Sequence, residues 1–163
     1  MTDLEPIGTS HLEVWVPAPA TRERVLDILG SGRHAWLGEL VRPATPPDEP
    51  ARYLLDLELR VGERTPRISF RKAALVDLGQ PSDEDGSVRV EIAWRAAGMT
   101  PLFPVFAGEL RWSSGVLRVE GVYAPPGGAV GAMADRLLLN VAARGTARRL
   151  LERIAEAMVA DAG

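Results

Sequence analysis

Apolar and polar residues alternate along six separate stretches of the chain, the pattern of strands with one buried and one solvated face. These stretches cover about residues 11–16, 53–61, 68–77, 88–95, 105–112 and 117–123. Ser113-Ser114-Gly115 separates the last two and is typical of a tight hairpin. The acidic segment Pro81 to Gly86 reads as another turn. We therefore predict consecutive antiparallel strands.

Helical patterns occur after the first strand and at the end of the chain. Thr21 can cap a short helix that runs to about Leu29, and a second short helix is expected around residues 34–40. After Gly128, about thirty residues without proline predict one long helix. Its approximate apolar stripe consists of Val130, Met133, Leu137, Val141, Leu151, Ile154 and Met158.

These elements predict an α+β fold in which a curved antiparallel sheet of about six or seven strands wraps around the long C-terminal helix. A six-stranded sheet is about 25–30 Å wide, whereas one helix is about 10–12 Å across. One helix cannot cover such a sheet flat, so the sheet has to curl. We expect residues 1–163 to form a single domain, because no linker or internal repeat interrupts them.

The space between sheet and helix is either filled by large side chains or open to a ligand. The residues expected to line it share the inward phase of a strand or the apolar stripe of the helix. They are Tyr53, Phe70, Trp94, Phe106, Trp112, Tyr123, Met133 and Leu137. We also expect residues 98–106, which combine Gly98, Pro101 and Pro104 with large apolar groups, to form part of the entrance.

Two charged residues are candidates for polar contact with a ligand. Lys72 shares the alternation phase of Phe70 and Ala74, which points its ammonium inward unless a bulge or its long stem brings it to water. Asp135 lies in the first two turns of the long helix. The helix dipole alone accounts for an acid there, and the alternative is an acid near the cavity mouth.

Composition narrows the chemistry further. The chain has no cysteine, and a net charge of −3 argues against nucleic-acid binding. His11 and His34 do not have the spacing of metal ligands. Residues 127–131 lack the sequence context of a phosphate loop, so we expect no metal and no nucleotide cofactor. Without a long apolar run or a signal sequence, a cytoplasmic protein without stable membrane insertion is expected.

The order of strand, two short helices, antiparallel meander and long helix resembles the START-like helix-grip superfamily, also called SRPBCC. This superfamily includes birch-pollen-allergen-type proteins and polyketide aromatase/cyclases. The resemblance covers nearly the whole chain, and two runs carry it most specifically, Leu102 to Leu110 and Leu117 to Gly128, with Gly131 and Asp135 on the helix. It implies a cavity for a hydrophobic ligand, but it does not imply one chemistry.

Three functions follow from these expectations. The first is binding of a small hydrophobic or amphipathic molecule between sheet and helix. The second is an aromatase/cyclase-like enzyme acting on a polyketide-type substrate, although no acid/base constellation is identifiable and no catalytic residue can be named. The third is a protein-interaction module that uses the outer surface of the sheet or the helix.

Overall fold

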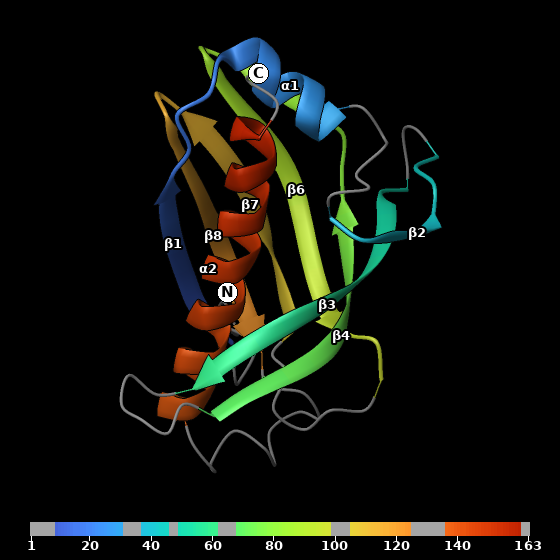
Figure 1. Ribbon diagram of the computed structural model, residues 1–163, viewed down its shortest axis with the longest axis vertical. Coiled ribbons are helices and arrows are strands. Elements are labelled where there is room, and N and C mark those ends of the chain that lie inside the picture. The colour runs from blue at the N-terminus through green and yellow to red at the C-terminus, as the bar shows by residue number, and fades with distance from the viewer. Residues whose placement is uncertain are drawn as a thin grey trace, which may run out of the picture.

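The computed structural model describes residues 9–30, 37–45, 49–61, 68–98, 105–124 and 136–160. They form one sheet and two helices, arranged as Figure 1 shows. The strands are β1 (Ser10–Pro17), β2 (Glu39–Arg42), β3 (Ala51–Val61), β4 (Ile68–Leu78), β5 (Ser82–Glu84), β6 (Ser87–Ala96), β7 (Val105–Ser113) and β8 (Val116–Ala124). The helices are α1 (Arg22–Gly30) and α2 (Arg136–Val159).

All strand pairings are antiparallel, as the sequence predicts. The strand order is β1-β8-β7-β6-β4-β3-β2, so the first strand lies beside the last one. β6 has different neighbours along its length, because its beginning pairs with β5 and its end pairs with β4. This change of partner lets the β3–β4 hairpin swing away from the β5 end of the sheet, toward α2 (Figure 1).

One face of the sheet packs against α2, and we call it the inner face. The strand phases predicted from alternation are confirmed on the strands whose side chains are described. In β1, for example, Leu12, Val14 and Val16 are buried while the residues between them are exposed. Because alternation is strict, the opposite or outer face collects the charged residues.

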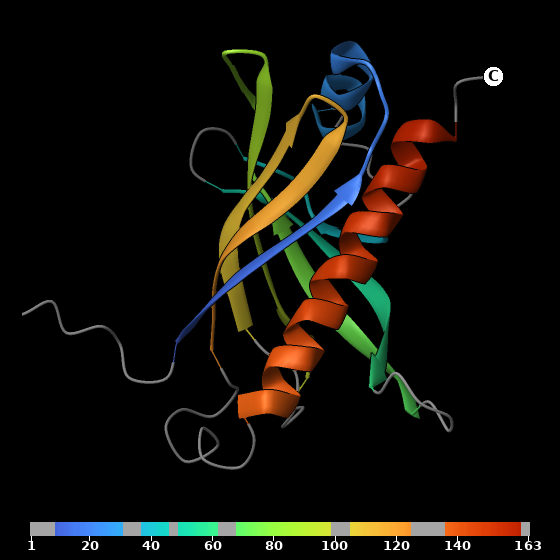
Figure 2. The ribbon, with the colours of Figure 1, turned by 90° about the vertical axis from the view of Figure 1, so that its left-hand side faces the viewer.

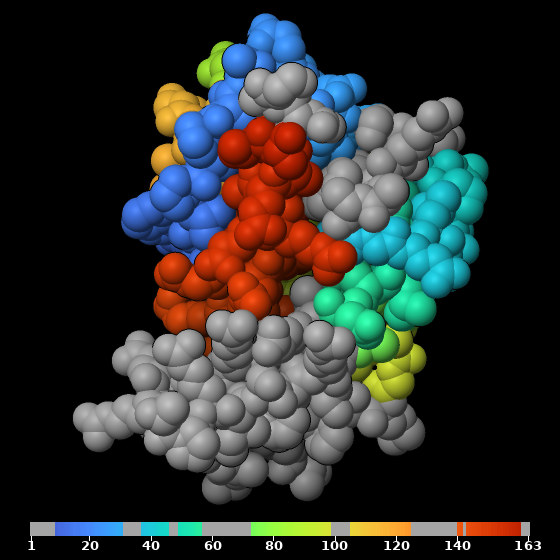
Figure 3. Space-filling model, in the orientation of Figure 1, coloured from blue at the N-terminus to red at the C-terminus, as the bar shows by residue number. Residues whose placement is uncertain are grey.

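α2 crosses the inner face and packs closely against β1, β8 and β3, whereas the central strands β4, β6 and β7 approach it less closely. Figure 2 shows α2 on one side of the sheet, and Figure 3 shows it between β1 and the β2–β3 region. The sheet therefore curves around the helix, as its width requires. The buried side chains of α2 in the described residues are Ala143, Thr146, Ala147, Leu150, Leu151, Ile154, Ala155 and Met158.

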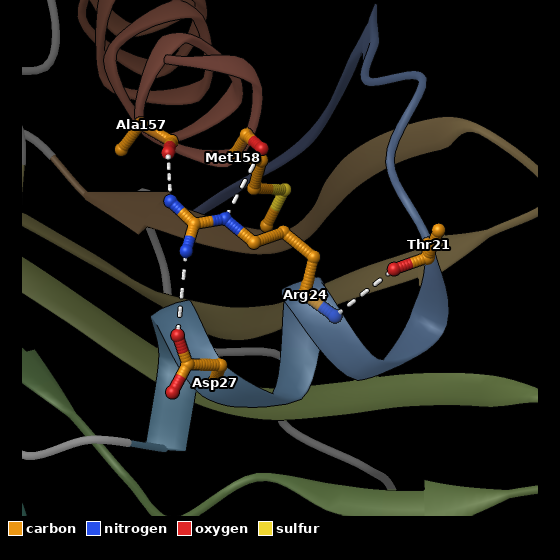
Figure 4. A network of polar contacts seen from close by, with 5 residues as sticks. All are labelled: Thr21, Arg24, Asp27, Ala157 and Met158. Atoms are coloured by element: carbon orange, nitrogen blue, oxygen red, sulfur yellow. Dashed lines mark hydrogen bonds and ion pairs between the residues drawn. The ribbon is translucent and has the colours of Figure 1, made fainter. Parts of the chain in front are cut away.

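α1 is fastened to the C-terminal end of α2 by Arg24 (Figure 4). The guanidinium of Arg24 donates to the main-chain oxygens of Ala157 at 3.3 Å and Met158 at 3.4 Å. These oxygens belong to the last turn of α2, where carbonyl groups lack helical partners. The hydroxyl of Thr21 accepts from the amide of Arg24 at 3.3 Å, which confirms Thr21 as the predicted helix cap.

Two tight turns close the hairpins β5–β6 and β7–β8. Ser114 and Gly115 have φ angles of 50° and 78°, and Asp85 and Gly86 have φ angles of 52° and 77°. Two successive positive φ values are the signature of the turn that matches strand twist. The hairpin predicted at Ser114-Gly115 is confirmed.

Three details of the sequence prediction are wrong. The second short helix does not extend through residues 39–40, because Glu39–Arg42 forms β2 beside β3. Gly38 permits this approach, since a Cβ there would lie 2.4 Å from the main-chain oxygen of Leu54. The acidic turn contains the three-residue strand β5, so the sheet has eight strands rather than six or seven. Val141, placed in the apolar stripe, is 46% exposed.

Candidate functional site

Four aromatic side chains lie in one line across the inner face, and we call Tyr53, Trp94, Phe106 and Tyr123 the aromatic row. The register pairs Phe106 with Tyr123 on one side and with Trp94 on the other. Val76 lies between Trp94 and Tyr53. With strands about 4.8 Å apart, the row extends about 20 Å across β8, β7, β6, β4 and β3.

The centre of the aromatic row lies on β6 and β7, which approach α2 less closely, while its ends lie on β3 and β8, which pack against α2. Its rings are buried, because Tyr53, Trp94 and Phe106 are 1–2% exposed and Tyr123 is 6% exposed. Large rings at these positions are the physical reason that a curved sheet and a single helix can enclose a continuous core here.

The centre of the row is a stacked pair. The rings of Trp94 and Phe106 have centroids 3.9 Å apart and planes inclined by 16°. Two glycines make room for Phe106 next to them on the inner face. A Cβ on Gly108 would lie 2.7 Å from Cζ of Phe106, and a Cβ on Gly121 would lie 2.8 Å from the same atom. The phenyl ring therefore occupies the space of two missing side chains.

The indole nitrogen of Trp94 is the unusual polar atom of this site. Nε1 is buried, and it finds no hydrogen-bond acceptor in the described part of the chain. The N–H lies in the plane of the indole, so in a stacked arrangement it does not point at the face of Phe106. A buried donor without a partner costs about 1–3 kcal/mol, a cost that an added acceptor at Nε1 would relieve.

Trp112, also predicted to line the cavity, lies elsewhere on the inner face. It is six residues from Phe106 along β7, which corresponds to about 20 Å. Its Nε1–H donates to the main-chain oxygen of Ala18 at 3.0 Å. Trp112 is thus buried at the α1 end of the sheet with its donor satisfied, and the structure does not bring it together with the aromatic row.

The remaining predicted site residues fall beyond what the structure describes. Phe70 and Lys72 belong to β4, opposite Leu59 and Leu57, but their side chains lie outside the described part. The side chain of Leu137 in α2 does so too, as do Met133 and Asp135 entirely. Of the predicted entrance segment, residues 99–104 also lie outside. Phe106, its last residue, is a buried strand residue of β7.

The outer face carries charged residues in ordered rows, whereas alternation along the sequence predicts only a solvated face. Four glutamates lie opposite one another across four neighbouring strands. On β8, β7 and β6, the adjacent position on the same face is an arginine. The rows are Glu13, Glu120, Glu109 and Glu91, and beside them Arg118, Arg111 and Arg89. Like charges directly opposite one another are unfavourable, so neighbouring rows of opposite sign compensate for them. Alternation revealed the face of each residue, but only the register revealed the rows.

Individual contacts show how this compensation works. Arg118 lies 3.3 Å from Glu13, and Arg111 lies 3.7 Å from Glu109. Further along the face, Arg52 donates to both oxygens of Asp77 at 2.7 and 2.8 Å. This hydrogen bonding raises the pKa of Arg52 above its ordinary value. The outer face is therefore a set of ion pairs, each worth about 1 kcal/mol or less.

Beside these rows the outer face has a hollow with a volume of about 600 Å³. Small residues such as Ala93 and Ala107 border the hollow, and carboxylates of Glu49, Asp77 and Glu91 surround it. Within the described ranges, no group of three or more His, Asp or Glu side chains has the arrangement of a metal site. His11 lies on this exposed side, where its Nε2 is 3.1 Å from Glu120 Oε1.

Comparison with known proteins gives no family assignment, because no family model and no curated protein matches the chain. The chain is similar to solved structures at low identity. One is the hypothetical protein jhp0584 from Helicobacter pylori, with 9% identity over 94% of this chain and 89% of that chain and a TM-score of 0.47. Another is a conserved protein from Geobacillus kaustophilus, with 13% identity over 94% and 95% of the two chains and a TM-score of 0.42.

A third similar structure is DynU16, a protein of the dynemicin biosynthetic locus. It is 17% identical over 87% of this chain, with a TM-score of 0.41, and this chain spans 46% of its length. Likenesses of this size carry no information on ligand or activity. None of the helices in the described residues has the length and apolarity needed to span a membrane.

Proposed function

We propose that this chain is a START-like helix-grip domain that binds a small hydrophobic or amphipathic molecule between the inner face of the sheet and α2. The observation that supports this most is the aromatic row. It crosses the inner face where the central strands stand away from α2, and it presents a stacked pair of rings and an unpartnered indole N–H. Aromatic walls with a single polar group are typical of small-molecule sites.

The near-complete burial of the row has a consequence for binding. Because Tyr53, Trp94 and Phe106 are 1–2% exposed, a ligand reaches them only when side chains or α2 move apart. Association is then limited by this opening and is slower than diffusion allows. Binding also shifts the conformational equilibrium toward the opened arrangement.

Binding is better supported than catalysis by the described residues. Their buried set contains no charged residue, and the hydroxyl-bearing residues in it are Thr146, Tyr53 and Tyr123. An aromatase/cyclase-like enzyme needs a group that moves a proton next to the substrate. No catalytic residue was predicted, and the side chains of Lys72 and Asp135, the residues predicted to contact a polar ligand group, lie outside the described part, so the enzyme is the second hypothesis.

A thermal-shift screen of fatty acids, sterols, flavonoids and aromatic polyketides tests the proposal. A ligand at about 100 times its dissociation constant stabilises the fold by about 2.7 kcal/mol, or about 5–10 °C for a chain of this length. Trp94→Leu should reduce this shift, whereas Arg89→Ala on the outer face should leave it nearly unchanged. Loss of the shift in Arg89→Ala alone would place the ligand on the outer face, and no shift with any class would favour the interaction module.

A further inference from the structure

We propose that the indole N–H of Trp94 donates a hydrogen bond to the oxygen of a neutral carbonyl ligand, so that the site selects ketones or esters over hydrocarbons and over carboxylates of the same shape. This inference rests on the proposed function, since it names the ligand class for the same site. It starts from Nε1, which is buried in a side chain only 2% exposed and lacks an acceptor in the described residues.

The neighbours of Trp94 in the aromatic row offer its N–H no acceptor. Its neighbours in the row are Phe106, stacked on it, and Val76, opposite it on β4. Neither side chain carries an oxygen. Trp112, which lies outside the row at the α1 end of the same sheet, is an internal comparison, because its N–H donates to the main-chain oxygen of Ala18. Among the described residues, the buried indole of Trp112 has its acceptor and that of Trp94 has none, so an acceptor from a ligand would satisfy Trp94.

The chemistry of the ligand follows from that of the site. An indole N–H is a donor only, so the partner must accept. A carboxylate is disfavoured, because the buried set of the described residues includes no charged group to compensate its desolvation. A hydroxyl would bring a second donor that itself needs an acceptor, and neither Phe106 nor Val76 beside Trp94 offers one. A carbonyl oxygen on an apolar molecule meets all three conditions.

Matched ligand pairs test this inference with defined probes. The pairs are fluorene and 9-fluorenone, androstane and androstan-17-one, and pentadecane and 2-pentadecanone, with palmitate as the charged comparison. Dissociation constants are measured by isothermal titration calorimetry on the full chain. For at least one shape we expect the ketone to bind about five- to tenfold more tightly than its hydrocarbon, the contribution of one hydrogen bond.

Two variants separate the N–H from the ring. Trp94→Phe keeps an aromatic side chain that can stack on Phe106 but removes the donor, and it should bring the ketone and the hydrocarbon to equal affinity. The matched control is Trp112→Phe, which removes a buried indole donor outside the aromatic row and should preserve the preference. If Trp94→Phe does not fold, the affinities of the wild type for each ketone and its hydrocarbon still show whether the site prefers a carbonyl ligand.

The possible results distinguish a failure of this inference from a failure of the proposed function. Equal binding of ketone and hydrocarbon by the wild type would overturn the inference and leave the proposed function standing. A preference unchanged in Trp94→Phe, or tighter binding of palmitate than of 2-pentadecanone, would also overturn it. Binding of no member of any pair would count against the proposed function itself.

Discussion

The indole of Trp94 lies 3.9 Å from the phenyl ring of Phe106, measured between ring centroids, and the two planes are nearly parallel. Their strands pair directly, so the contact joins β6 to β7 at the middle of the aromatic row. Phe106→Ala should lower the free energy of unfolding by about 3–5 kcal/mol, because it removes a buried ring and leaves a cavity beside Trp94. Chemical denaturation measures this loss.

Trp94 also serves as the spectroscopic reporter in that experiment. Loss of the stacked partner should change the near-ultraviolet circular dichroism of the tryptophans. The control is Val105→Ala, one residue earlier in β7, where the side chain is 44% exposed. That variant should change stability by less than about 1 kcal/mol. Equal effects of the two substitutions would show that Phe106 does not pack as described.

The glycine pair next to Phe106 gives a second prediction. A Cβ on Gly108 would lie 2.2 Å from the main-chain oxygen of Glu120, and one on Gly121 would lie 2.3 Å from that of Ala107. Because backbone cannot yield as a flexible side chain can, Gly108→Ala and Gly121→Ala should each destabilise by more than about 3 kcal/mol or prevent folding. Gly98→Ala is the matched control, since no atom lies within 4 Å of its added Cβ. Thermal unfolding of all three distinguishes these effects.

The β7–β8 turn predicts a stabilising substitution. Ser114 has a φ of 50°, in the left-handed region that asparagine tolerates better than serine. Ser114→Asn creates the Asn-Gly sequence preferred in this turn and should raise stability by about 0.5 kcal/mol. Gly115→Ala, at a φ of 78°, should instead lower it by about 1–2 kcal/mol. Denaturant midpoints measure both changes, and a rise for Gly115→Ala would contradict the assigned turn.

The hydrogen bonds of Arg24 to the last turn of α2 give a prediction about local unfolding. Arg24→Met retains the apolar stem but loses the donors to the carbonyls of Ala157 and Met158. We expect a loss of about 1–2 kcal/mol and faster hydrogen exchange confined to α1 and the last turns of α2. Arg148→Met, exposed on α2, is the control and should leave exchange there unchanged. Equal exchange in both variants would show that Arg24 does not hold α1 against the end of α2.

The long strands were predictable because strict alternation marks both an element and its buried face. β2 and β5 were missed for physical reasons. Glu39–Arg42 is only four residues long, and Ser82–Glu84 has no apolar residue, so neither shows a periodic pattern. Both strands exist because neighbouring strands offer main-chain partners, which is a property of the assembled sheet.

The candidate site was predictable in part, because alternation shows the face on which a residue lies but not its neighbours on the adjacent strands. Alternation assigned Tyr53, Trp94 and Tyr123 to one face, but it could not place them in a single row, because cross-strand register depends on turns and pairing. Trp112 has the same phase and nevertheless lies about 20 Å from Phe106 along the strand. The free N–H of Trp94 also needed the structure, since a sequence does not show which buried donors find acceptors.

The most direct test of ligand binding on the inner face is a titration followed by the indole N–H signals in a nitrogen–proton correlation spectrum. Trp94 reports on the inner face, and Trp15, which is 58% exposed on the outer face, is the reference. Trp94→Phe assigns the Trp94 signal. With 9-fluorenone, androstan-17-one or 2-pentadecanone as probe, we expect the Trp94 signal to move downfield while that of Trp15 stays in place. Movement of Trp15 alone, or an unmoved Trp94 signal with all three probes, would contradict this expectation.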